Sequence, residues 1–528
     1  MITSDSMDGR MLDPSHPIGH SVEMPYLRAL SARGTNFVSS YTHSPVCGPS
    51  RASALTSRFV HDTGTWNNYQ ELVIDVTGAL DTRCIAHYGK AQCTEWAADY
   101  PSGSGILFDA FADAGYETAI FGKVDIGANV PARYSDGDDQ VDHTGPEMRT
   151  VPRGAGLVRN SMDWGGWSDP IETNDNGYHI DAKTTNQTLT WMRARSANVS
   201  ETRPFFAYTG LNIPHPDFIT GPKWLARVNR STVTPPWAPD DPSLLHPYDW
   251  HMSVSKGCTE PTTTDTMLRI KTTYLAMCAQ ADDFHGAVLN ELHALGWENN
   301  TIVVFWSDHG ELAFDARQVL KDSFREGSAR VPLIFAGPGV AAGRTVTAPA
   351  SLLDLWPTLA DLTGIAPPTG ARGLSLASAL APGLTPGARA ENFVVGEFFA
   401  ENADTGSFFI VQGVWKLITY GHSFPWFQNY TAQLYNLTAD PGEQINRATQ
   451  HIDVVAALDA LLISALDASY QDIDALAMRN DQLIFRSYLT AGKNLRQVRA
   501  GFAGTYKNFS DTDWERVLLW NQTEPSRM

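Results

Sequence analysis

Apolar residues along the chain form two kinds of run, short continuous runs and longer runs with helical spacing. The short runs predict buried strands at 118–121, 205–211, 301–306 and 332–336, and residues 35–41 predict a further extended segment. The longer runs predict helices at 25–33, 106–114, 264–295 and 351–363. This alternation is typical of a doubly wound, mostly parallel sheet flanked by helices, so we expect an α/β fold.

The pattern changes near residue 385. A Pro- and Gly-rich stretch at 366–389 predicts a linker or long surface loop. Short strand-like runs and one helix follow it, at 393–399, 407–411, 415–420 and 453–466. We therefore expect a large domain at 1–385 and a smaller α+β domain with an antiparallel sheet at 386–528. We expect the last 60 residues to wrap back onto the main body.

Charged and polar residues follow several of the predicted strands directly. Asp5 ends the opening run of the chain, Lys123 follows 118–121, and Asp308 and His309 follow 301–306. In an open α/β sheet, sites form just beyond the carboxyl ends of the strands. Carboxylate oxygens in such a place favour Ca²⁺ or Mg²⁺, although an imidazole is an unusual ligand for calcium.

The charge balance narrows the range of partners. The chain of 528 residues carries 39 Lys and Arg against 58 Asp and Glu, a formal net charge of −19. This balance argues against a nucleic-acid partner.

No stretch reaches the roughly 18 apolar residues of a membrane helix. Because the first residues already predict the tail of a buried strand, we expect the true N-terminus, with any targeting segment, to lie upstream of Met1.

Two further patterns favour passage through the secretory pathway. Asn-x-Ser/Thr occurs eight times, at Asn186, Asn198, Asn229, Asn299, Asn429, Asn436, Asn508 and Asn521. Of the five cysteines, four remain if Cys47 is reserved for chemistry, and these could form two disulfides. Cys84 with Cys93 and Cys258 with Cys278 is the simplest pairing, but the two other pairings and four buried thiols stay open.

One segment resembles the signature of a known family. Cys47-Gly48-Pro49-Ser50-Arg51, followed by Leu55-Thr56, is similar to the sulfatase signature. The resemblance implies an alkaline-phosphatase-like fold and oxidation of Cys47 to formylglycine by a formylglycine-generating enzyme. We predict that a helix starts at Ser50, which would place residue 47 at the positive end of a helix dipole. The alternative is a buried cysteine before a helix with ordinary start residues.

The resemblance also implies a metal site. Asp5, Asp308 and His309 would bind a divalent metal together with residue 47, with calcium ahead of magnesium. Asp8 is a weaker candidate, because a turn role explains it equally well.

The resemblance further implies a cluster of cations around the sulfate. Arg51 would hold the nucleophile near the metal, and Lys123, His215 and Lys321 would orient the sulfate. His215, fixed between two prolines, is our first choice for protonating the leaving oxygen, and Lys321 is the second.

Three residues depart from the usual sulfatase pattern, namely Ser6, Asp125 and His309. The same departures occur in a subgroup that removes the 2-sulfate of glucuronate during glycosaminoglycan breakdown. The chain also resembles that subgroup at 4–10, 66–68, 122–125, 211–216 and 274–279. We therefore expect a sulfatase that acts on a sulfated sugar such as 2-sulfated glucuronate, with aryl sulfates as surrogates. The resemblance implies a lysosomal, vacuolar or extracellular location.

Two other functions stay open at this point. The same fold hydrolyses phosphodiesters and phosphonate esters, so a phosphodiester could be the true substrate. A non-catalytic, glycan-binding relative of a sulfatase is the second alternative.

Overall fold

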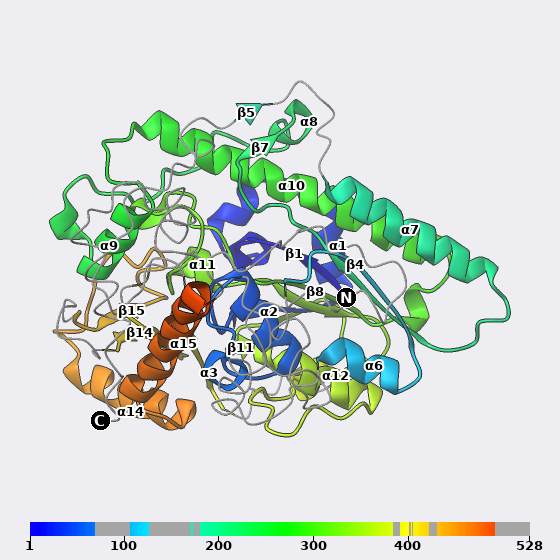
Figure 1. Ribbon diagram of the computed structural model, residues 1–528. Coiled ribbons are helices and arrows are strands. Elements are labelled where there is room, and N and C mark those ends of the chain that lie inside the picture. Colours follow the sequence, from blue (N-terminus) through cyan, green and yellow to red (C-terminus); the bar gives the residue numbers. More distant parts are fainter. Residues whose placement is uncertain are drawn as a thin grey trace.

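A seven-stranded sheet forms the centre of the computed structural model, in the order β10-β2-β9-β8-β1-β6-β4 (Figure 1). The structure describes residues 1–68, 106–125, 171–172, 180–383, 391–400, 403, 405–421 and 430–490, without side chains at 481–490. The strands are β1 (Ile2–Ser4), β2 (Gly34–Phe37), β4 (Glu117–Gly122), β6 (Phe205–Gly210), β8 (Val303–Ser307), β9 (Leu333–Ala336) and β10 (Arg344–Val346).

The sheet is mostly parallel, as the sequence predicts. β1 pairs in parallel with both β6 and β8, and β6 pairs in parallel with β4. β9 is the exception, since it runs antiparallel to both of its neighbours, β8 and β2. The carboxyl ends of β1, β4, β6 and β8 therefore meet at one edge, where the polar residues that follow them come together.

Helices cover both faces of this sheet (Figure 1). One face packs against α1 (Pro25–Ala32), α7 (Asp181–Ala197) and α10 (Thr264–Ala294), and the other against α2 (Cys47–Thr56), α6 (Leu107–Asp113) and α12 (Leu355–Thr363). Neighbouring strand residues alternate between the two cores, because successive side chains of a strand point to opposite faces. Phe121 and Phe305 belong to the first core, and Ile120 and Val304 to the second.

A second sheet follows toward the C-terminus. It is an antiparallel meander of β12 (Phe393–Phe398), β13 (Ser407–Gln412), β14 (Trp415–Tyr420) and β15 (Gln433–Asn436). α14 (Ile452–Leu466) and α15 (Tyr470–Thr490) pack beside it. Lys416 of β14 is fully buried and bonds Glu326 at 2.8 Å and Glu443 at 2.7 Å, which ties this sheet to the main body. A division of the chain at residues 385 and 386 stays a prediction.

Short elements fill the connections. They are β3 (Ser40–Tyr41), β5 (Ile171–Glu172), β7 (Ile219–Thr220), β11 (Ala350–Ser351), α3 (Val60–Thr63), α8 (Pro222–Leu225), α9 (Pro247–Ser255), α11 (Glu326–Ala329) and α13 (Ala377–Leu380). α13 lies within 366–389, where we expected only a linker or loop. Its Ala379 and Leu380 are buried in the second core, so part of that stretch is core.

Cys258 and Cys278 do not form a disulfide, which was the simplest of the pairings that the sequence left open. Both thiols are free and buried. The Cys258 thiol donates to the carbonyl oxygen of Lys256 at 3.5 Å, whereas Cys278 lies on α10 in the first core. Burial among other residues, and not a cross-link, accounts for both cysteines. Cys84 and Cys93 lie outside the described residues.

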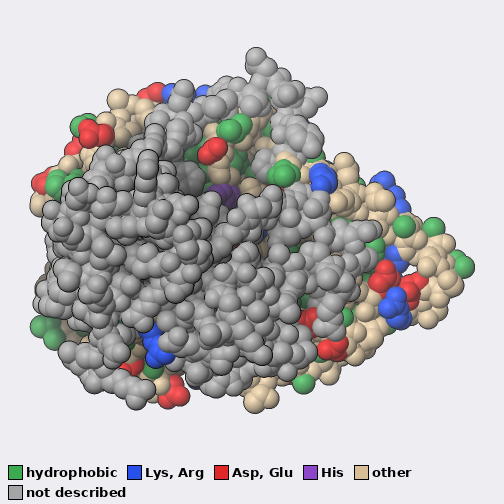
Figure 2. Space-filling model, viewed as in Figure 1, with side chains coloured by type: hydrophobic (Ala, Val, Ile, Leu, Met, Phe, Trp, Pro, Cys, Tyr) green, Lys and Arg blue, Asp and Glu red, His purple; other side chains and the backbone are tan. Residues whose placement is uncertain are grey.

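The described surface mixes charges of both signs. In Figure 2, acidic and basic side chains lie intermixed over the end of α7 and the segment after it. Arg193 pairs with Glu291 and Arg203 with Glu201, each at 2.6 Å. Among the residues that the structure describes, no helix has the length and apolarity to cross a membrane.

Candidate active site

Four possible metal ligands meet at the carboxyl edge of the central sheet. Asp5 follows β1, Asp308 and His309 follow β8, and Cys47 is the first residue of α2. One ligand atom from each of the four lies within 4.8 Å of the other three, and all four residues are buried. The structure thus brings together residues that are up to 304 positions apart in sequence (309 − 5).

The His309 ring is oriented for ligation. Its Nδ1 lies 2.9 Å from the carbonyl oxygen of Gly310, a bond in which Nδ1–H donates. Nε2 is then the unprotonated nitrogen, and it faces Asp5 Oδ1 at 3.6 Å and Asp308 Oδ2 at 3.8 Å. Burial lowers the pKa of His309, which keeps the ring neutral. Two carboxylates and a neutral imidazole fit a divalent cation.

Arg51 binds the carboxylates of both Asp5 and Asp308. Its Nε donates to Asp308 Oδ2 at 2.8 Å and its Nη2 to Asp5 Oδ2 at 3.3 Å. Nη1 donates to the Lys123 carbonyl and to the Tyr208 hydroxyl, both at 3.0 Å. Burial would raise the pKa of Asp5, but the surrounding cations, Lys123 first among them, hold it well below its usual value. Burial outweighs Arg51 at Asp308 and raises the pKa of that carboxyl.

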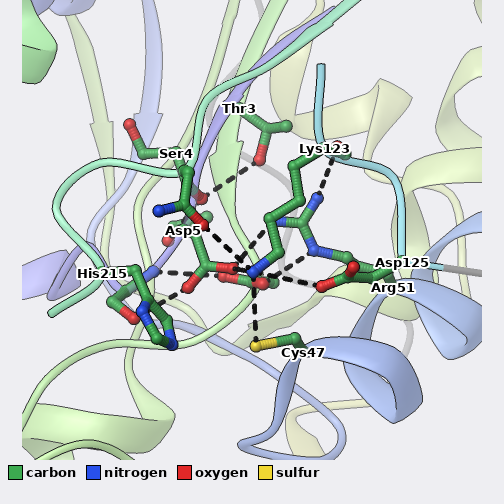
Figure 3. Close-up of polar contacts among 12 residues, drawn as sticks. Thr3, Ser4, Asp5, Cys47, Arg51, Lys123, Asp125 and His215 are labelled. Carbon is green, nitrogen blue, oxygen red and sulfur yellow. Dashed lines mark hydrogen bonds and ion pairs between the residues drawn. The ribbon is translucent and has the colours of Figure 1, made fainter. Parts of the chain in front are cut away.

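The Cys47 sulfur lies close to His309 and to two lysine ammoniums, and Figure 3 shows it facing the ammonium of Lys123. Its sulfur is 3.2 Å from His309 Nε2, 3.5 Å from Lys321 Nζ and 4.0 Å from Lys123 Nζ. α2 begins at Cys47 itself and not at Ser50, so the sulfur lies within the first turn of the helix. Burial, followed by the charge of Asp5, raises the pKa of the thiol. As an unmodified cysteine it is therefore a poor nucleophile, because the thiolate is the reactive form.

The Lys123 ammonium is held among three oxygens (Figure 3). It lies 2.7 Å from Asp5 Oδ2, 3.2 Å from Asp125 Oδ2 and 3.3 Å from Asn212 Oδ1. Burial alone would lower the pKa of Lys123, but the carboxylates of Asp125 and Asp5 raise it well above its usual value. Asp125, one of the three residues noted above as departures, is thus an ion-pair partner of the lysine.

His215 and Lys321 complete the cluster of polar side chains around Cys47. His215 Nδ1 is 2.6 Å from the carbonyl oxygen of Pro216, so Nδ1 carries the proton. Its Nε2 lies 2.9 Å from Lys321 Nζ and accepts a proton from that ammonium. Burial, followed by Lys321, lowers the pKa of His215 well below its usual value. The ring is neutral here, and Lys321 carries the protons.

Comparison with known proteins shows the family to which this chain belongs. The model of the Sulfatase family matches residues 2–365, more than half of the chain. The chain belongs to the sulfatase family. It is therefore a sulfuric ester hydrolase by family, and sulfatases generally bind a divalent metal.

Individual relatives are similar over nearly their whole length. Arylsulfatase K of Homo sapiens is 31% identical over 527 residues, which covers 95% of this chain and 88% of that protein. Arylsulfatase K of Danio rerio is 33% identical over 488 residues and covers 88% and 83%. Among solved structures, a phosphonate monoester hydrolase from Silicibacter pomeroyi has a TM-score of 0.64 at 21% identity, covering 88% and 94%. A 2-O GAG sulfatase has a TM-score of 0.61 at 22% identity, covering 89% and 92%. These structures confirm the fold.

Three residues that hold the site in place were not identified from the sequence. Tyr208 donates to the carbonyl oxygen of Lys123 at 3.1 Å and meets Arg51. Tyr274 of α10 bonds the backbone of Ser6 at 2.8 Å and of Asp8 at 2.9 Å. Asp181 accepts three bonds from the backbone N–H groups of Asn212 and Ile213, at 2.7 and 2.9 Å. Helical spacing gives no sign of these roles, because each depends on a strand end far away in sequence.

Asp8 stabilises a turn, which is the alternative to metal binding that the sequence left open. Its carboxylate caps the turn at Gly9–Leu12 through the Arg10 backbone N–H at 2.9 Å and pairs with the Arg10 side chain at 2.8 Å. It does not belong to the group of four possible ligands.

Proposed function

We propose that the protein hydrolyses sulfate esters through a formylglycine made from Cys47. The observation that carries this proposal is the place of the Cys47 sulfur, 3.2 Å from His309 and 3.5 Å from Lys321. The neighbours of the sulfur include both possible metal ligands and lysine ammoniums that suit a sulfate. An unmodified thiol with a raised pKa does not explain such surroundings, whereas an oxidised side chain does.

The chemistry of a hydrated aldehyde suits this position. It has two hydroxyl groups on one carbon. The oxygen of one attacks sulfur, the bond from sulfur to the alcohol oxygen breaks, and sulfate stays on residue 47. The second hydroxyl then loses its proton and collapses to the aldehyde, which breaks the C–O bond and expels sulfate. A serine ester has no such internal exit.

We assign the surrounding residues by charge and reach. Arg51 fixes Asp5 and Asp308, and Lys123 and Lys321 stabilise the negative charge that builds up on the sulfate oxygens. Lys321 replaces His215 as our first choice for protonating the leaving oxygen, because His215 Nε2 accepts a proton in the described geometry. His215 then orients the Lys321 ammonium.

A divalent cation, with calcium ahead of magnesium, fits between Asp5, Asp308, His309 and residue 47. When bound, it would act as a Lewis acid toward an oxygen of residue 47.

For the substrate we propose a sulfated sugar, with 2-sulfated glucuronate first and aryl sulfates as surrogates. The similarity to arylsulfatase K over 95% of the chain supports an aryl sulfate as a first assay substrate. The three departures at Ser6, Asp125 and His309 support the sugar, by their resemblance to the glucuronate-2-sulfatase subgroup. A secretory location and a formylglycine-generating enzyme as maturation partner belong to the same proposal.

The test is mass spectrometry of the peptide that contains Cys47, from protein made in a host with the maturation enzyme. We expect the mass to fall by the difference between a CH₂SH group and an aldehyde. A known sulfatase made in the same host is the control.

Conversion followed by hydrolysis of an aryl sulfate would support the proposal. An unmodified Cys47 beside a converted control, with tight binding of a glycan, would favour a binding protein. Much faster hydrolysis of a phosphodiester would favour a phosphoesterase.

A further inference from the structure

The segment at 312–322, which carries Lys321, follows an unusual backbone path. Six of its residues other than glycine have φ between 46° and 79°, namely Ala313, Phe314, Ala316, Arg317, Leu320 and Asp322. This conformation is strained for a residue that has a side chain, and it persists only where the surroundings hold it. The position of Lys321 therefore depends on contacts from outside this segment.

Lys256 supplies such a contact. It follows α9 directly, and its side chain is fully buried. Its ammonium donates to the carbonyl oxygen of Lys321. It also lies 3.5 Å from Gln318 Oε1 and 3.6 Å from Asp322 Oδ2. A buried ammonium is costly unless it is paired, and here all these partners belong to the segment that carries Lys321.

Other bonds join the same two parts of the chain. Gln318 Nε2 donates to Asp249 Oδ1 at 3.2 Å, and Arg317 Nε donates to the Cys258 carbonyl at 3.2 Å. These bonds hold 317–318 against α9 and the residues after it. The residues on either side of Lys321 have anchors of their own, since the Asp322 N–H donates to the Pro45 carbonyl at 3.1 Å and the Leu320 N–H donates to Glu311 Oε1 at 2.5 Å. Lys256 binds residue 321 itself, three to four residues beyond the bonds at 317–318.

We propose that Lys256 is a positioning residue for Lys321. By binding the carbonyl of Lys321 and the carboxylate of Asp322, it keeps Lys321 Nζ within 3.5 Å of residue 47, where the sulfate has to bind. The inference rests on the proposed function, because it assigns the Lys321 ammonium to the sulfate. The competing explanation is that Lys256 only neutralises Asp322 within the core.

The decisive variants are Lys256→Met, which keeps the length of the side chain without its charge, and Lys321→Ala. We expect Lys256→Met to lower kcat/KM by about 100-fold, the loss that follows displacement of a catalytic group by about 1 Å. Lys256→Arg should recover part of this loss. If Lys256 acts through Lys321, the double variant should be no slower than Lys321→Ala alone. Independent, multiplying losses would overturn the proposal.

Lys416→Met is the matched control. Lys416 is equally buried, but its partners are Glu326 and Glu443 and not the segment at 312–322. We expect this variant to lose stability in chemical denaturation while it keeps kcat/KM per folded molecule. An equal fall in kcat/KM for both variants would mean that any buried lysine matters alike, and would overturn the proposal.

A crystal structure of Lys256→Met gives a readout without turnover. We expect Lys321 Nζ to move away from residue 47, and an unchanged Lys321 would overturn the proposal. If Lys256→Met does not fold, the structure of Lys256→Arg and its combination with Lys321→Ala decide in the same way. A wild-type protein that carries formylglycine but hydrolyses no sulfate ester would instead contradict the proposed function. The position of Lys321 in the variant structure would still test whether Lys256 positions it.

Discussion

At the scale of single residues, Arg51 determines how two buried carboxylates can lie side by side. Asp5 and Asp308 are both fully buried, and two such charges repel each other in a medium of low dielectric. The guanidinium touches both of them, at 3.3 and 2.8 Å. The planar fork of arginine is suited to this bridging, because separate N–H groups of one guanidinium can each donate to a different carboxylate.

The sharpest prediction at this scale concerns Cys47. We expect Cys47→Ala and Cys47→Ser to lower kcat by at least about a thousandfold, since under the proposed mechanism both variants lack the nucleophile and with it the covalent route. The serine variant should also fail, because maturation in this pathway needs a thiol. Both variants should keep their denaturation midpoints close to the wild-type value, since the side chain loses only one atom or exchanges it. Unchanged turnover of an aryl sulfate by either variant would rule out the mechanism.

The residues that the sequence did reveal are those that follow apolar runs or lie in a motif, such as Asp308 and Lys123. Their place at strand ends could be predicted because the runs before them mark the strands. Asp181, Tyr274 and Lys256 could not be found in this way. Each acts on the backbone of a distant segment, and a backbone carbonyl or N–H leaves no mark in the sequence.

At the scale of elements, the end of β6 depends on a carboxylate from another element. Asp181, the first residue of α7, accepts bonds from the Asn212 and Ile213 backbone just after β6. We expect Asp181→Asn to lower the free energy of unfolding by about 2 kcal/mol, the value of a hydrogen bond to a charged group. It should also lower kcat/KM by roughly tenfold through displacement of His215. Denaturation and steady-state kinetics measure the two effects, and unchanged values of both would contradict this role.

A second element-level feature joins α3 to the C-terminal sheet. His61 Nδ1 lies 2.8 Å from Glu397 Oε2 of β12, and the His61 backbone N–H donates to Oε1 at 2.8 Å. Burial would lower the pKa of His61, but Glu397 raises it. Burial would raise the pKa of Glu397, but His61 and His43 lower it.

These shifts predict a pH dependence of stability. The raised pKa of His61 contributes stability that is fully present below about 6.5 and is lost as the pH rises through the folded pKa. The lowered pKa of Glu397 contributes stability that is present above about 4.3 and is lost as the pH falls through its folded value. We therefore expect this pair to stabilise the protein most between about pH 4.3 and 6.5.

The comparison of wild type with His61→Gln tests this expectation. Melting temperatures measured from pH 5 to 8 should converge as the pH rises, because the wild type alone loses the charged pair. Parallel curves would show that the pair contributes nothing that depends on pH. A second variant, Glu397→Gln, should give the same convergence.

The elements themselves were largely predictable from apolar spacing. α1, α10 and β6 lie within a residue or two of their predicted bounds, because the two helices have a clear period and the strand is a continuous apolar run. The start of α2 was misplaced by three residues, since Val46 caps it without a side-chain bond and offers no start signal. The sequence also did not predict that β9 runs antiparallel to its neighbours. A strand that is buried on both faces is apolar along its whole length, whichever way it runs.

At the scale of the whole molecule, the possible metal site ties three parts of the chain together. Its four residues come from β1, α2 and the end of β8, so a bound cation should stabilise the entire main domain. We expect removal of metal with a chelator to lower the melting temperature and abolish turnover. Added Ca²⁺ at about 100 times its Kd should restore about 2.7 kcal/mol.

Asp308→Asn is the matched control for this experiment. It keeps the shape of the side chain but loses a charged ligand, so its melting temperature should respond far less to chelator and to Ca²⁺. A wild-type melting temperature that is the same with and without chelator would contradict a structural contribution of the metal. Recovery by Mg²⁺ and not by Ca²⁺ would reverse the expected order of the two ions.

The buried position of Cys47 sets a time limit on its chemistry. The finished fold exposes only 3% of this residue, and its sulfur contacts Lys321, which is synthesised 274 positions later (321 − 47). At about 5–20 residues per second, a ribosome needs on the order of tens of seconds to make that length of chain. An enzyme that must reach the thiol would therefore find it open on the nascent chain and closed soon after release. Slower translation between Cys47 and Lys321 would then raise the fraction of molecules that mature.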